Sequence, residues 1–239
     1  MVTTLTIDRR FRGPRRSGNG GVSAGLAAGF LDGPATVRLR RPPPLGRPLP
    51  VQRGPADVQV LDGDELLLQA RPASEGVEVT VDHALLQRTF DRGTAPVPQD
   101  HAAPECFVCG PRDDGLGIYP TALDGTELWA TVWMPGRSVA SDGRQVDPHV
   151  VWGALDCPAG FAVVRAGRGP LTHFPALTEF TVTLDHPVRI GEPVAVWGWS
   201  TGRDEDHVDG ATAIIDADGV VRATGYARHA LLPVDFAYR

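Results

Sequence analysis

Short segments that alternate between hydrophobic and polar residues run through most of the chain, and turns rich in glycine and proline separate them. Alternation with a period of two is typical of antiparallel strands that bury one face. The 28 glycines and 22 prolines are spread between these segments instead of being massed in one tract. The pattern therefore predicts a strand-rich protein with many turns.

Two segments break this alternation because they are apolar around their whole circumference. One spans residues 20–31 and reads GGVSAGLAAGFL, and the other spans about residues 150–164 within HVVWGALDCPAGFAVV. A helix without a polar face is surrounded by protein instead of lying on a surface. We therefore predict two central helices, and we expect strands within residues 3–12 and 35–71 to form an antiparallel sheet that wraps the first of them.

Glycines recur every fourth residue in the first predicted helix, at Gly21, Gly25 and Gly29. A helical glycine costs roughly 1 kcal/mol relative to alanine, so its repetition indicates that another backbone comes close. We expect that backbone to belong to the sheet. Laying Gly25 on Gly153 brings the two helices into register. In this alignment Ala28 corresponds to Asp156.

The chain also contains an internal repeat. The segment TVRLRRPPPLGRPLPV, which starts at Thr36, aligns without a gap on TVTLDHPVRIGEPVAV, which starts at Thr181. Each copy reads as a strand, a turn with proline and glycine, and a second strand. A repeat of this length indicates two copies of one fold. We predict an N-terminal unit at residues 1–82, a connecting segment at 83–114 and a C-terminal unit at 115–239.

Four motifs carry a resemblance to a known family: SGNGGVSAGLAA and RPPPLGRPL in the first half, and CFVCGPRDDGLGIYP and VVWGALDCPAG in the second. With an apolar helix between strands present twice, the chain resembles the hot-dog fold of acyl-CoA thioesterases and dehydratases over about residues 1–81 and 115–232. The resemblance implies an α+β double hot-dog, with two antiparallel sheets each wrapped around a central apolar helix. It also implies an acyl-thioester hydrolase whose substrate lies between the helix start of one unit and the helix of the other.

Charge and cysteine content narrow the partners and the location. The net charge of −6 argues against a general nucleic-acid surface, so we predict no nucleic-acid partner. Three cysteines are too few for a disulfide framework, no secretion signal opens the sequence, and no apolar run reaches the roughly 18 to 20 residues that cross a bilayer. We therefore expect a cytoplasmic protein without a membrane partner.

Arginines concentrate in the first fifty residues, where they could attract a phosphorylated small molecule or form a solvated face. They are Arg9, Arg10, Arg12, Arg15, Arg16, Arg38, Arg40, Arg41 and Arg47. From this set we take Arg15 and Arg16 as candidate substrate-binding residues. Trp152 in the second helix and Thr178 in the strand after it are the other candidates for substrate binding.

Thioester hydrolysis requires donors that stabilise an oxyanion and a group that activates water or attacks directly. The Gly20-Gly21 turn offers unobstructed backbone N–H groups at the positive end of a helix. Asp156 is the acid inside the second central helix, where partial desolvation would favour a role as general base or nucleophile. Because its counterpart is Ala28, we expect one working site. The alternatives are helix packing for the glycines, and for Asp156 a structural hydrogen bond to backbone across the unit interface.

Two further residues are candidate members of the catalytic site. Asn19 precedes the first helix and could cap it, or orient a water molecule or the thioester; these roles are compatible. His149 lies at the start of the second helix, where it could act as an acid or base or help to position the thioester. The alternative for His149 is a capping or surface histidine.

Cofactor motifs are lacking in the sequence. Cys106 and Cys109 form a C-x-x-C pair, but no second pair or histidine pair follows at a zinc-site spacing, so Cys157 or His101 could complete a site only through tertiary contact. We predict no metal and no cofactor. Rossmann, P-loop and G-x-S-x-G patterns are likewise missing from the sequence.

Two other functions remain open alongside hydrolysis of an acyl-CoA or acyl-carrier-protein thioester. One is a non-catalytic protein that binds acyl-CoA or lipid. The other is an enoyl hydratase or dehydratase, although Asp142, Asp147 and His149 match the acid and histidine spacing of such enzymes poorly. A homodimer of double hot-dogs is a possible assembly, although an internal pseudo-dimer removes the need for one.

Overall fold

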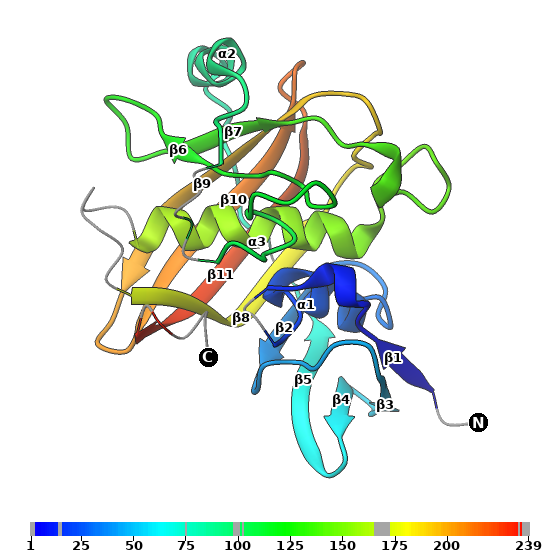
Figure 1. Cartoon of the computed structure of the whole chain (residues 1–239). Helices are drawn as coiled ribbons and strands as arrows, with labels where there is room; N and C mark the ends of the chain where they lie inside the picture. The colour runs from blue at the N-terminus through cyan, green and yellow to red at the C-terminus, as the bar shows by residue number, and fades with distance from the viewer. Residues whose placement is uncertain are drawn as a thin grey trace.

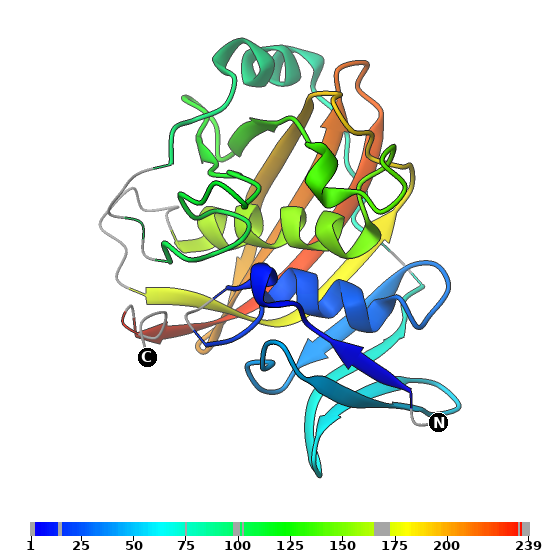
Figure 2. The same ribbon diagram turned by 45° about the vertical axis from the view of Figure 1, so that its right-hand side comes forward.

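One antiparallel sheet of 11 strands forms the frame of the protein, and two helices lie side by side on one of its faces (Figures 1 and 2). This computed structural model describes residues 3–13, 16–74, 76–97, 101, 103–164, 173–233 and 235. The strand order is β1-β3-β4-β5-β2-β8-β11-β10-β9-β7-β6. The order of the N-terminal strands, from β1 to β2, mirrors that of the C-terminal strands from β7 to β8, as the sequence repeat requires.

The helices are α1 (Gly20–Ala28), α2 (His83–Arg92) and α3 (Pro148–Val164), with 3-10 turns at Arg9–Phe11 and Arg137–Val139. The N-terminal strands are β1 (Thr4–Thr6), β2 (Ala35–Leu39), β3 (Pro48–Arg53), β4 (Val58–Asp62) and β5 (Glu65–Pro72). The C-terminal strands are β6 (Thr121–Ala122), β7 (Trp129–Trp133), β8 (His173–Leu184), β9 (Val194–Arg203), β10 (His207–Asp216) and β11 (Val221–Pro233). In the part of the chain described here, no helix combines the length and the apolar character needed to cross a membrane.

The two expected sheets are joined into one, because β2 and β8 pair with each other (Figure 1). Thr36 and Thr181, which correspond in the repeat, are direct cross-strand partners, and their hydroxyl oxygens lie 2.8 Å apart. The seam is therefore a pseudo-twofold contact between equivalent strands. An ion pair between Arg38 and Glu179 lies beside it. Joining the sheets pairs two edges that would otherwise expose unpaired backbone groups.

The two central helices pack against each other through glycine. A Cβ atom added to Gly21 would lie 2.5 Å from the Trp152 carbonyl oxygen, and one added to Gly25 would lie 2.7 Å from the Trp152 Cβ. The expectation that these glycines admit the sheet was wrong, because they admit α3 instead. A Cβ on Gly29 would come no closer than 3.4 Å to any atom it meets. The α1 and α3 axes run in opposite directions, since Gly21 lies by Asp156 and Gly25 by His149.

The first helix and strand differ in length from their predicted bounds. α1 ends at Ala28, three residues before the predicted end at residue 31, and β1 covers three residues before the chain turns at Arg9–Phe11. α3 begins at Pro148, where proline loses no intrahelical hydrogen bond because the first helical N–H has no partner in any case. The first residues of the two helices, Gly20 and Pro148, correspond to each other in the alignment that lays Gly25 on Gly153.

The segment between the two halves contributes to both sides of the sheet. α2 packs against β7 and β9, where the Trp197 indole N–H donates to the Thr89 hydroxyl at 3.0 Å. Ala195 and Trp197 of β9 pack with Leu86 of α2, whereas Val196 belongs to the core that contains α3. Successive side chains of β9 point to opposite faces of the sheet, and the side chains on both faces are buried, one set against α2 and the other toward α3. The loop that follows α2 returns to the side of α1 and α3, where the Phe107 N–H donates to the Arg12 carbonyl.

Candidate active site

A cavity of about 450 Å³ opens between the start of α1, the second half of α3 and the strands β8 and β11. Asn19 and Gly20 contribute from α1, and Asp156, Gly160 and Phe161 contribute from α3. The strands contribute Leu177, Thr178 and His229. The volume lies in the range of small-molecule sites. The structure thus brings the predicted helix start and the predicted acid to one cavity.

The carboxylate of Asp156 is held in a fixed orientation. Its Oδ2 accepts a hydrogen bond from the Gly21 backbone N–H at 2.9 Å and a longer one from the Asn19 side-chain amide at 3.3 Å. The Asp156 residue is buried, with 8% of its surface exposed. Asn19 also caps α1, because its Oδ1 accepts from the Val22 N–H at 2.9 Å. Asn19 therefore caps the helix, as one of its two predicted roles requires, and its side-chain amide also contacts the acid. Its other predicted role, orienting a water molecule or the thioester, stays a prediction.

His229 of β11 is the polar residue of the site that the sequence analysis missed. Its side chain is 1% exposed, and its Nε2 lies 3.9 Å from the Asp156 Oδ1. Neither ring nitrogen of His229 has a hydrogen-bond partner among the residues that the structure describes. A separation of 3.9 Å is too long for a direct hydrogen bond, but a water molecule off the line between the two atoms can bridge them. Buried polar atoms left without partners are costly, so these atoms are suited to a bound water or ligand.

Glycine also makes room for the imidazole. A Cβ on Gly160, one helical turn beyond Asp156 on α3, would lie 3.5 Å from the His229 Nε2. No local motif marks His229 in the sequence. Its signal is a histidine on the buried face of a strand, and that signal becomes readable only when the phase of β11 is known.

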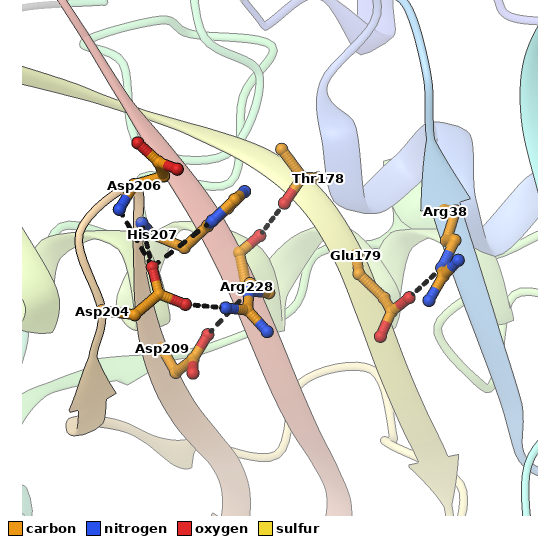
Figure 3. A network of polar contacts seen from close by, with 8 residues as sticks. All are labelled: Arg38, Thr178, Glu179, Asp204, Asp206, His207, Asp209 and Arg228. Carbon is orange, nitrogen blue, oxygen red and sulfur yellow. Dashed lines mark hydrogen bonds and ion pairs between the residues drawn. The ribbon is translucent and has the colours of Figure 1, made fainter.

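Thr178 lies at an irregularity between β8 and β11. Glu179 pairs with Arg228 and Leu177 pairs with His229, so Thr178 is the extra residue of a β-bulge. The Thr178 hydroxyl donates to the Arg228 carbonyl oxygen at 2.9 Å (Figure 3). This bond ties the bulge to the backbone immediately before His229. Thr178 also lines the cavity. Its hydrogen bond holds β8 and β11 together directly beside His229.

The side chain of Arg228 belongs to a separate network of charged residues (Figure 3). Its guanidinium pairs with Asp204, and its Nε lies 3.7 Å from an Asp209 carboxylate oxygen. The Asp204 carboxylate also accepts from the backbone N–H groups of Asp206 and His207, which holds the pKa of Asp204 below its ordinary value. Successive side chains of a strand point to opposite faces, so this network leaves His229 to the cavity side.

Backbone N–H groups at the start of α1 are the candidate oxyanion donors. The amide of Gly21 is used by Asp156, and the amides of Val22 and Ser23 are used by Asn19. For the Gly20 amide, no acceptor is found in the described part of the chain, and Gly20 lines the cavity. The first N–H of a helix carries partial positive charge. The Gly20 amide therefore remains as a donor for a ligand oxygen, while the Gly21 amide orients the acid.

Two predicted site residues lie away from the cavity. Trp152 is buried and packs edge-on against Phe180, with ring centroids 5.6 Å apart. His149 packs edge-on against Phe11 at 5.1 Å, and burial lowers the pKa of its imidazole. Neither Trp152 nor His149 lines the cavity. Both side chains serve the packing around the other end of the α1–α3 pair.

Two arginines other than the predicted Arg15 and Arg16 line the cavity. Arg15 falls outside the described residues, and Arg16 is exposed and is not part of the cavity wall. Arg40 and Arg41, directly after β2, do line the cavity. The Arg41 guanidinium also pairs with Glu65 at 2.8 Å. The sequence marks these two arginines by a difference between the copies of the repeat. The first copy has Arg40 and Arg41 where the second copy has Asp185 and His186.

The three cysteines of the chain meet at the wall of the same cavity. The sulfur atoms of Cys106, Cys109 and Cys157 all lie within 4.8 Å of one another, and those of Cys106 and Cys157 are 3.8 Å apart. The thiols of Cys109 and Cys157 hold the pKa of Cys106 well below its usual range, and the same contacts raise the pKa of Cys157. Cys157 thus joins the C-x-x-C pair by the tertiary contact that the sequence alone left open.

Comparison with known proteins identifies the fold. No protein-family model and no curated protein sequence matches the chain. Among solved structures, the chain is similar to a tesB protein from Mycobacterium avium subspecies paratuberculosis (TM-score 0.55, 16% identity, 96% of this chain and 91% of that one). It is also similar to an acyl-CoA thioesterase II from Mycobacterium marinum (0.54, 14%, 89% and 90%). A third similar structure is a protein of unknown function with a hot dog fold from Alicyclobacillus acidocaldarius (0.51, 12%, 95% and 92%).

These similarities extend over nearly the whole length of each protein. The fold is therefore of the hot-dog type found in these structures, with a large antiparallel sheet and few helices. At such low identity the comparison establishes the fold, and the chemistry has to be argued from the cavity itself.

Proposed function

We propose that the protein is a hydrolase of acyl thioesters, with acyl-CoA as the substrate on which the proposal is tested. One observation carries it: the Asp156 carboxylate, oriented by the Gly21 amide, lies 3.9 Å from the imidazole of His229, whose nitrogens have no partner among the described residues, and a water molecule off that line can bridge the two. The Gly20 amide lines the same cavity. A base, a water position and an oxyanion donor are the parts that thioester hydrolysis requires.

In the proposed reaction, a water molecule bound between Asp156 Oδ1 and His229 Nε2 attacks the thioester carbonyl carbon. Asp156 acts as general base and takes a proton from the water as the new C–O bond forms. The Gly20 N–H stabilises the oxyanion of the tetrahedral intermediate. The C–S bond then breaks, the proton on Asp156 passes to the leaving sulfur, and the products are a carboxylic acid and a free thiol.

The remaining cavity wall fits a thioester with a phosphorylated carrier. Phe161, Phe174 and Leu177 supply apolar surface for an acyl group, and Arg40 and Arg41 supply positive charge for phosphate. Coenzyme A and the prosthetic arm of an acyl-carrier protein both carry phosphate, so both substrate classes fit this chemistry.

The similar structures add support at the level of fold. Two of them are described as a tesB protein and as an acyl-CoA thioesterase II. Because the chain contains an internal repeat, we propose that it is a tandem of two hot-dog units, at residues 1–82 and 115–239, joined by residues 83–114. The proposal includes a cytoplasmic location and needs no resident cofactor for hydrolysis.

A second candidate function is binding of an acyl thioester without turnover. It is favoured by the bond between Asp156 Oδ2 and the Gly21 amide, because that bond links the two helices and would be retained by a carboxylate with a purely structural role. The two functions differ in what Asp156 Oδ1 does, so a substitution that keeps the structural bond separates them.

Asp156→Asn is this substitution, because the asparagine carbonyl can still accept from Gly21 while it cannot accept a proton from water. We expect kcat/KM for acyl-CoA hydrolysis, followed by release of free thiol, to fall by roughly 10³-fold. Binding of a non-hydrolysable thioether analogue is expected to persist. Asp216→Asn is the matched control, since Asp216 is equally buried but lies outside the cavity, and its hydrolysis rate is expected to stay near that of the wild type.

An unchanged rate in Asp156→Asn would contradict the assignment of the base. Wild-type protein that binds acyl-CoA of several chain lengths without releasing thiol would favour the binding function instead. A change in enoyl-CoA absorbance, without thiol release, would point to hydration of a double bond.

A further inference from the structure

The cysteine cluster forms a separate site in the cavity wall that thioester hydrolysis does not use. We propose that Cys106, Cys109 and Cys157 bind a zinc ion, with the fourth coordination position open toward the cavity. The proposal depends on the position of the three sulfur atoms and does not depend on the hydrolase function.

The spacing of the sulfur atoms fits a tetrahedral ion. Zinc–sulfur bonds of about 2.3 Å at tetrahedral angles place two sulfur atoms about 3.8 Å apart. The Sγ atoms of Cys106 and Cys157 are 3.8 Å apart, and all three sulfur atoms lie within 4.8 Å of one another. Small rotations about the cysteine side-chain torsions bring the remaining pairs to the same spacing.

The backbone presents the ligands from two rigid sources. Cys106 and Cys109 come from one turn, in which the Gly110 N–H donates to the Cys106 carbonyl at 2.9 Å. A C-x-x-C spacing of this kind lets a single turn supply two thiolates to one ion. Cys157 comes from α3, directly after Asp156. An ion at this place would tie the loop after α2 to the helix that carries the proposed base.

The thiol chemistry also favours a metal. Thiolates select thiophilic ions such as zinc, and zinc binding releases the thiol protons to solvent. The Asn19 side-chain amide lies 3.8 Å from the Cys106 sulfur and 4.0 Å from the Cys157 sulfur, where its N–H groups can donate to bound thiolates.

The fourth position follows from the same geometry. Three protein ligands leave one tetrahedral position free, and all three cysteines line the cavity. Water or an atom of a ligand in the cavity would fill it, as in zinc sites with three protein ligands. The proposed zinc ligands are the three cysteines, whereas the proposed water is bound by Asp156 Oδ1 and His229, so the two sites use different side chains.

Cobalt(II) substitution tests the proposal with the whole reduced chain. Sulfur-to-cobalt charge-transfer absorption can arise only from this cluster, because the chain has three cysteines in all. We expect one cobalt per chain with charge-transfer and tetrahedral ligand-field bands, and zinc added in equal amount is expected to displace it. Cys109→Ser and Cys157→Ser are expected to weaken cobalt binding by more than about 100-fold.

Asp156→Asn serves as the matched variant beside Cys157, and it is expected to keep the cobalt spectrum while it loses hydrolysis. Circular dichroism and the thermal midpoint of each apo variant show whether it is folded. Wild-type protein that gives no charge-transfer band overturns the proposal, as does an undiminished band in folded Cys157→Ser.

Discussion

The antiparallel pair of α1 and α3 has two ends that are equivalent in the repeat and different in chemistry. At one end the start of α1 meets Asp156, whose Oδ2 accepts from the Gly21 amide. At the other end the start of α3 meets α1 at Gly25, and a Cβ there would lie 2.8 Å from the His149 Cα. The counterpart of Asp156 at this end is Ala28, which is buried. The same close helix approach thus frames an acid at one end and apolar packing at the other.

The difference between the ends shows that the backbone alone does not make the site. The first residue of α1 is Gly20, which has an available N–H, whereas the first residue of α3 is Pro148, which has none. His149 packs against an aromatic ring, while His229 has no hydrogen-bond partner among the described residues and faces Asp156. A duplicated frame with one polar end and one packed end predicts a single site per chain.

Replacing the histidine at each end should separate the two ends most sharply. We expect His229→Leu to lower kcat/KM for acyl-CoA hydrolysis by about 100-fold, because the water loses one of its two partners while Asp156 remains. His229→Gln, which keeps a hydrogen-bonding group, is expected to lose less. His149→Gln is the matched control at the other end and is expected to remain within about twofold of the wild type. Equal losses for His229→Leu and His149→Gln would remove the distinction between the ends.

Features set by short-range pattern were predictable from the sequence. The two apolar helices and the strands of the repeat follow from periodicity and from the gapless alignment. The meeting of the Gly20 turn with the Asp156 helix was expected from the resemblance to hot-dog proteins. The direct pairing of Thr36 with Thr181 was latent in that alignment, but which strand edges meet depends on tertiary docking. The sequence analysis therefore expected two sheets, whereas the pairing of β2 with β8 joins them into one.

The residues that could not be found from pattern depend on phase and register. Trp152 was a reasonable candidate because α3 is apolar on every side, so the sequence does not say which side faces the cavity. His229 faces Asp156 because of the phase of β11, and the bulge at Thr178 decides which residue of β8 lies beside it. Cys157 joins Cys106 across 51 positions, a contact that no local spacing encodes.

Adding one methyl group to Gly25 of α1, and one to the C-cap residue Gly29, tests whether the helix contact is as close as the geometry requires. Gly25→Ala should destabilise the fold by about 2 kcal/mol, because its Cβ would lie 2.7 Å from the Trp152 Cβ and the helices must separate. Gly29→Ala is expected to be neutral or to stabilise by up to about 1 kcal/mol, since Gly29 has helical backbone angles and an added Cβ would come no closer than 3.4 Å to the atoms it meets. Free energies of unfolding from urea titration measure both. Similar values for the two variants would mean that α1 does not pack closely on α3.

The smallest expected effect concerns the pH dependence of the packed end. Burial lowers the pKa of His149 from its ordinary value of 6.5, with the charge of Asp147 opposing the shift and that of Arg10 adding to it. The unfolded chain therefore takes up a proton near pH 6.5 while the folded protein does not, so stability falls as the pH drops below that value and levels off beneath the folded pKa. The loss should stay below about 1 kcal/mol because part of the ring reaches solvent. Urea titrations of His149→Gln between neutral and mildly acidic pH should show a shallower decline than the wild type, and parallel declines would mean that the pKa of His149 is the same in the folded and unfolded protein.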